Sequence, residues 1–174
     1  MKNFIKVFFV AFLMMAPGAI FAQKALKFGH INSQEVITVM PERDSAVVKL
    51  QKFNKELSDS YEEQNVELNK KYQKFLEEEK TLNEVVKKTR QEEIQQMQQR
   101  IQQFQETAQQ QMTAKNSELM QPILEKIKKA ITDVGKEGGF LYIFDVGGAT
   151  NVLFFSSESQ DVTPLVKQKL GIKK

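Results

Sequence analysis

Two stretches of sequence decide the fold of this chain: residues 50–82, LQKFNKELSDSYEEQNVELNKKYQKFLEEEKTL, and residues 89–112, TRQEEIQQMQQRIQQFQETAQQQM. In both, apolar residues recur in steps of three, four or seven, which is the spacing of one face of an α-helix. The first stripe comprises Leu50, Phe53, Leu57, Tyr61, Leu68, Tyr72, Phe75 and Leu82. The second comprises Ile94, Met97, Ile101, Phe104, Ala108, Met112, Leu119, Ile123, Ile127, Ile131 and Val134. The sequence therefore predicts two long amphipathic helices between residues 45 and 134.

A short break near residues 86–89 separates the two predicted helices. Thr89-Arg90-Gln91-Glu92 has the form of a capping box, so we expect the second helix to begin there. Because the connection is short, the helices must return antiparallel, which places Phe75 opposite Ile101. An arm of about forty residues is roughly 60 Å long and must project from a domain of this size.

The first twenty-two residues have the pattern of a secretory signal peptide. Lys2 and Lys6 precede an apolar run at residues 7–15, and Pro17-Gly18 breaks the chain before the small residue Ala22. This pattern predicts export and removal of residues 1–22.

The charge balance of the remaining chain limits its partners. Without the two lysines of the signal, 23 basic residues face 22 acidic ones, for a net charge of +1, and the chain contains no cysteine. We therefore expect no nucleic acid partner and at most peripheral contact with a membrane. The fold cannot be stabilised by a disulfide. No second apolar run is long enough to span a bilayer, so we expect a soluble mature protein.

Short β patterns flank the helical arm. Residues 25–31 alternate as a strand, with Phe28 and His30 on one face and Ile31 on the other. Ser33 is expected to cap a brief helix, which Pro41 ends.

On the other side of the arm, glycines at 135 and 138–139 are expected to end the second helix. Residues 140–145 and 151–155 are predicted to form a hairpin around Gly147-Gly148. Thr163-Pro164 then begins a final helix that places Leu165, Val166 and Leu170 on one face. The expected class is α+β: a small β body from residues 23–44 and 135–174, with residues 45–134 inserted as the arm.

The second arm helix contains an unusual number of glutamines, eleven between residues 91 and 111. Glutamine is a good helix former, so one interpretation is a solvated helix face. The other is a low-complexity segment that tends to aggregate. Ile94, Met97, Ile101 and Phe104 keep helical spacing through this segment, which favours the first interpretation.

The sequence lacks the residues of common catalytic sites. It has no cysteine, no Gly-x-Ser-x-Gly elbow, no phosphate-binding loop and one histidine, His30. A lone histidine on a strand is more often structural than a base or a metal ligand. We therefore expect no enzymatic activity, no metal and no cofactor.

The two apolar stripes are expected to meet in a seam between the arm helices. Apolar residues outside this seam are candidates for contact with other proteins. On the arm these are Val66, Leu76, Val85, Val86 and Met120, to which Met97 and Met112 would be added if the seam rotates. The body is too small to close a core alone, so we expect it to assemble with other copies. The residues expected in that assembly are Phe28, Ile31, Phe140, Tyr142, Phe144, Val152 and Phe154.

Over its whole mature length the chain resembles the Skp/OmpH family of periplasmic chaperones. The resemblance rests on segment 28–36 (FGHINSQEV), the long charged hairpin, the strand ending in Asp145 and segment 161–166 (DVTPLV), in this order behind a signal peptide. It implies a jellyfish-like homotrimer whose arms enclose unfolded outer-membrane proteins in the periplasm without nucleotide. The predicted arm tip departs from the positive tips of well-studied members, because residues 77–93 contain six acidic and four basic residues. A structural coiled-coil tether of the cell envelope is the alternative function.

Overall fold

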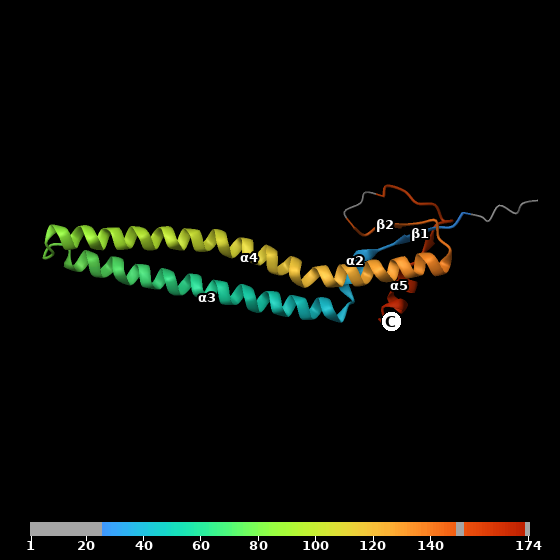
Figure 1. Ribbon diagram of the computed structural model, residues 1–174, viewed down its shortest axis with the longest axis horizontal. Coiled ribbons are helices and arrows are strands. Elements are labelled where there is room, and N and C mark those ends of the chain that lie inside the picture. The colour runs from blue at the N-terminus through green and yellow to red at the C-terminus, as the bar shows by residue number, and fades with distance from the viewer. Residues whose placement is uncertain (1–25, 149–151, 173–174) are drawn as a thin grey trace, which may run out of the picture.

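The computed structural model describes residues 26–148 and 152–172 of the chain. Its elements follow in the order β1 (Phe28–Ile31), α2 (Ser33–Thr38), α3 (Pro41–Glu78), α4 (Glu84–Gly138), β2 (Tyr142–Asp145), β3 (Gln160–Asp161) and α5 (Thr163–Lys169). Helices α3 and α4 lie side by side as a long arm, and the strands, α2 and α5 gather at one end of it (Figure 1). The predicted combination of a few strands with two long helices is confirmed.

The turn at the tip of the arm comes earlier than predicted. Helix α4 begins after Asn83, whose Oδ1 accepts a hydrogen bond from the Val86 amide at 3.0 Å. Thr89 therefore lies inside α4, where its Oγ1 donates to the Val85 carbonyl oxygen. The predicted start at Thr89 was wrong because Asn83 offers the same cap six residues earlier.

The earlier turn also changes which residues face each other across the arm. An ion pair at 3.8 Å joins Lys71 to Glu93, so α3 residues near the tip face residues close to the start of α4. The predicted placement of Phe75 opposite Ile101 was wrong for this reason.

The seam between the two arm helices is tight at both ends and looser between them. Phe75, Ile94, Met97 and Ile101 are buried near the tip, and Ala46, Ile123 and Ile127 are buried near the body. Between these ends, residues 47–74 of α3 and 102–122 of α4 include no fully buried side chain. Helices gain most of their stability from packing, so the middle of the arm has the weakest support.

The sheet is parallel, with strand order β2-β1-β3. The predicted hairpin was wrong: residues 152–155 form no strand, and β3 pairs with β1 instead. Residues 149–151, which include the first residue of the predicted returning strand, lie outside the described residues. Gly147 is not part of a hairpin turn but allows a close approach, since a Cβ there would lie 2.0 Å from Asn32 Oδ1.

One face of the sheet packs against α2, α5 and the last third of α4. The resulting core contains Ile31, Val36, Met40, Ala46, Ile123, Ile127, Ala130, Val134, Val162 and Val166. Helix α4 ends at Gly139, which has a φ of 67° in the left-handed region, as predicted, whereas Gly135 lies within the helix. The arm and body therefore share one continuous helix.

The two short helices begin one residue away from their predicted caps. Asn32 rather than Ser33 caps α2, with its side chain accepting from the Glu35 amide. Val162 occupies the cap position of α5. Leu165 was predicted on the core face of α5 but is 40% exposed.

Asp145, at the end of β2, fastens the sheet to the start of α2. Its carboxylate accepts hydrogen bonds from the Ser33 amide at 3.1 Å, from the Ser33 hydroxyl and from the Gly147 amide at 3.0 Å. Burial acts to raise the pKa of Asp145, but these hydrogen bonds outweigh it and hold the pKa below its ordinary value. The ionised carboxylate therefore stabilises the fold.

Replacing Asp145 by asparagine should lower the free energy of unfolding by about 1.5–3 kcal/mol at about pH 7, because hydrogen bonds to a charged group are lost. A folded-state pKa below the unfolded value gives stability that is present above about pH 4 and is lost as pH falls through the folded-state pKa. The difference between the two proteins should therefore shrink in acid. Urea unfolding followed by circular dichroism at several pH values measures it, with the exposed Asp44→Asn as the control. A difference that is constant with pH would contradict the assignment.

Candidate functional site

The face of the sheet opposite to the helices carries a row of exposed aromatic side chains. Phe28, Tyr142 and Phe144 lie there with 39%, 59% and 47% of their surfaces exposed. Their rings form a row, with centroids 6.3 Å apart for Phe28 and Tyr142 and 5.9 Å apart for Tyr142 and Phe144. Parallel sheets are normally covered on both faces, yet in the described part of the chain the helices cover only one. We call this exposed row the aromatic sheet face.

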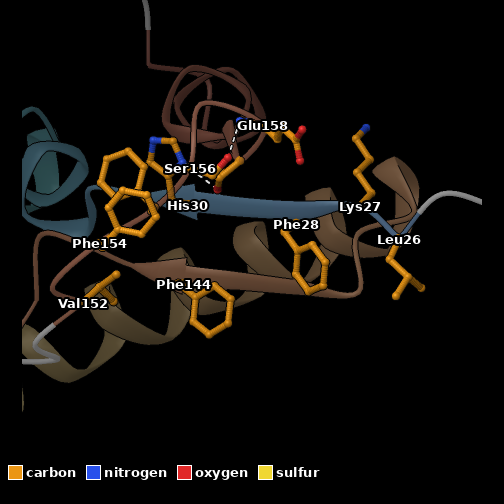
Figure 2. A pocket seen from close by; sticks show the side chains of 11 residues that line it. Leu26, Lys27, Phe28, His30, Phe144, Val152, Phe154, Ser156 and Glu158 are labelled. Carbon is orange, nitrogen blue, oxygen red and sulfur yellow. Dashed lines mark hydrogen bonds between the residues drawn. The ribbon is translucent and has the colours of Figure 1, made fainter.

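A groove of about 630 Å³ runs along the aromatic sheet face. Figure 2 shows Phe28 on β1 and Phe144 on β2 along this groove, with Phe154 and His30 at one end. The lining residues are Leu26, Lys27, Phe28, His30, Phe144, Val152, Phe154, Phe155, Ser156, Glu158 and Ser159. The groove is mainly apolar, as expected of a surface that another apolar surface covers.

His30 holds the segment after β2 against the sheet. Its ring stacks on Phe155 with centroids 4.2 Å apart, and its Nδ1 lies 3.0 Å from Ser159 Oγ. Both contacts are structural. Along the same segment, Leu153 and Phe154 are 94% and 82% exposed, so this chain alone provides them almost no packing.

The structure separates the residues predicted for assembly into two groups. Phe28, Tyr142, Phe144, Val152 and Phe154 lie on the aromatic sheet face or line its groove. In contrast, Ile31 is buried in the core and Phe140 packs against that core.

The strand alternation in the sequence had already placed Ile31 on the face opposite to Phe28. Leu153 and Phe155 are exposed on the same segment as Phe154, and the apolar run at residues 152–155 was the signal for this segment.

The residues predicted for contact along the arm also divide by exposure. Val66, Leu76, Val85 and Val86 are exposed, and Val85, beside the tip turn, is the most exposed at 77%. In contrast, Met97 is buried in the seam, Met112 is half-buried, and Met120 is half-buried against the core. The exposed valines and leucine are therefore the accessible members of the set.

The described residues contain no group of three or more histidine, cysteine, aspartate or glutamate side chains that could hold a metal ion. Among the helices of residues 26–148 and 152–172, none is both long enough and apolar enough to cross a membrane.

Comparison with known proteins identifies the family. No curated protein matches this sequence. The family described as outer membrane protein (OmpH-like) matches residues 27–170, which include every helix and strand described above. The chain therefore belongs to the OmpH-like family, and this membership suggests a periplasmic, chaperone-like role.

Proposed function

We propose that this protein is a periplasmic holdase chaperone that encloses unfolded outer-membrane proteins between its arms and prevents their aggregation without ATP. In this proposal three copies assemble through their aromatic sheet faces, and the three arms project in the same direction. The observation that carries the proposal is a parallel sheet, at the root of a long arm, with one face that residues 26–148 and 152–172 leave open.

The sheet supports assembly because of its chemistry. Aromatic side chains bury about 150–250 Å² each when fully covered, and three partly exposed rings form a row on this face. Leu153 and Phe154 extend the apolar surface beyond the strands. Covering it with neighbouring copies of the chain would remove apolar surface from water, which favours assembly.

The arm supports enclosure because it is long and polar and carries isolated, exposed apolar residues. Val66, Leu76, Val85 and Val86 are spread along the tip half of the arm, so no single site would hold a client tightly. Many weak contacts at high effective concentration can restrain an unfolded chain and still release it. Unfolded barrel strands expose edges that aggregate, and this is the hazard that enclosure prevents.

Aggregation of an unfolded outer-membrane barrel protein should be suppressed by the mature protein without nucleotide. The barrel protein is diluted from urea into buffer, with and without an equimolar amount of assembled chaperone, and light scattering is followed. Serine at Val66, Leu76, Val85 and Val86 should weaken protection while helicity stays unchanged. Exposed Val48 and Leu124, on the half of the arm nearer the body, provide the matched control substitutions. Scattering that is the same with and without the wild-type protein would refute the proposal and leave an envelope tether as the better account.

A further inference from the structure

One surface of α4 differs in chemistry from the rest of the arm. All eleven glutamines between residues 91 and 111 are exposed. Between residues 94 and 114 only Arg100 and Glu106 are charged. Helix α3, in contrast, carries charges along most of its length, several of them paired within the helix, as in Lys55–Asp59 at 2.7 Å. Over residues 94–114, α4 therefore presents mainly neutral amides, whereas α3 presents charges.

Five of these glutamines form one continuous stripe. They are Gln95, Gln98, Gln102, Gln105 and Gln109, and their spacing of three and four residues places them on one face of the helix. Each lies one residue beyond Ile94, Met97, Ile101, Phe104 or Ala108, so the stripe runs directly beside the seam. We call these five residues the glutamine flank.

The amides of the glutamine flank are free to bind other groups. Within the described arm, the side-chain hydrogen bonds come from asparagine, threonine, serine and charged residues, as in Asn65 to the Tyr61 carbonyl oxygen at 2.8 Å. None involves a glutamine of the flank. Each glutamine offers two N–H donors and one carbonyl acceptor, the same groups that a peptide backbone presents.

We propose that the glutamine flank is the surface along which the arm contacts the peptide backbone of an unfolded client. This inference rests on the proposed holdase function and names its recognition chemistry. An unfolded barrel strand carries unpaired N–H and C=O groups, which an amide can meet whatever the client's side chains are. A neutral flank also neither attracts nor repels a client by its net charge.

The spacing of the flank fits a partner without fixed register. Successive glutamines rise by about 5 Å along the helix axis, whereas same-side groups of an extended chain repeat about every 6.8 Å. The two repeats do not match, so a client cannot lock onto the stripe in one position. Contacts of this kind are short-lived and independent of sequence.

The test compares charge and amide chemistry on the same flank. One variant carries Gln→Glu at all five positions, and a second carries Gln→Ala at the same positions. Binding of an unfolded barrel protein of net negative charge is measured by fluorescence anisotropy in about 0.1 M and about 1 M NaCl, between which the Debye length falls from about 10 Å to about 3 Å.

The wild-type dissociation constant should change less than about threefold with salt, because the flank is neutral. The glutamate variant should bind about tenfold more weakly in about 0.1 M NaCl and recover most of that loss in about 1 M NaCl. The alanine variant should bind several-fold more weakly at both salt concentrations. The matched control places alanine at Gln96, Gln99, Gln103 and Gln110, on the neighbouring exposed face, and should stay within about twofold of wild type at both salt concentrations.

Several outcomes would overturn the inference. Client affinity unchanged in both flank variants would show that clients do not touch the flank. A change in sedimentation with unchanged client affinity would make the flank a contact between arms. Wild-type binding that is lost in about 1 M NaCl would assign recognition to the charges of α3. Absence of any binding by the wild-type protein would instead refute the proposed holdase function itself, which keeps the two failures distinct.

Discussion

Replacing Phe144 by glutamate should convert the assembled protein to monomers. Phe144 lies within the row of rings on the aromatic sheet face, where the proposed assembly would bury it. Burying an ionised carboxylate without a partner costs several kcal/mol, so three subunits at about 3 kcal/mol each lose on the order of 9 kcal/mol. This corresponds to about a millionfold fall in the association constant. Sedimentation velocity at micromolar concentration measures the change.

The matched control for this variant is Leu165→Glu. Leu165 lies on α5 with 40% of its surface exposed, close to the 47% of Phe144, but it is outside the aromatic sheet face. The control should sediment like the wild type. If Phe144→Glu remained assembled, the aromatic sheet face would not be the contact between subunits. A monomeric wild-type protein would exclude the assembly altogether.

A protein with a shortened arm should assemble normally but lose its protection of unfolded barrel proteins. Deleting Lys55–Tyr72 from α3 together with Ile94–Gln111 from α4 removes about five helical turns from each helix, or about 27 Å of arm. Phe75 then takes the seam position of Leu57, and Met112 takes that of Ile94, so the apolar stripe continues across both junctions. The proposed enclosure loses most of its walls, so light scattering of a diluted barrel protein should rise to nearly the level without chaperone.

Two measurements separate loss of enclosure from loss of folding. Circular dichroism should show the helix content expected of the shorter chain, and sedimentation should show the same number of subunits as in the wild type. Full protection by the shortened protein would contradict enclosure by the arms and transfer client binding to the body.

The sequence predicted the features that depend on local spacing. The stripes beginning at Leu50 and Ile94 gave both arm helices, because burial of one face sets a period that a single chain reveals. Gly139 ends α4 as expected, since its φ of 67° is favourable only for glycine. The same local logic placed Phe28 and Ile31 on opposite faces of β1.

The features that the sequence did not predict depend on contacts between distant segments. Thr89 and Asn83 offer equally good caps, and only the packing of α3 against α4 decides between them. Gly147-Gly148 has the composition of a hairpin turn, but Asn32 approaches Gly147 closely because β1 and β2 run parallel. The pairing of β3 with β1 was missed because a two-residue strand has no period to detect.

The position of the arm between β1 and β2 has a consequence for how this protein folds. Ser33 and Asp145 are in contact although they are 112 residues apart in sequence, and closing so long a loop is slow in a disordered chain. Once α3 and α4 have paired from the turn at Asn83, however, the two ends of the arm already lie together and the remaining loops are short. We therefore expect the sheet to form quickly only after α3 and α4 have paired from the turn to the body. Pairing of the arm helices would then assist the folding of the body.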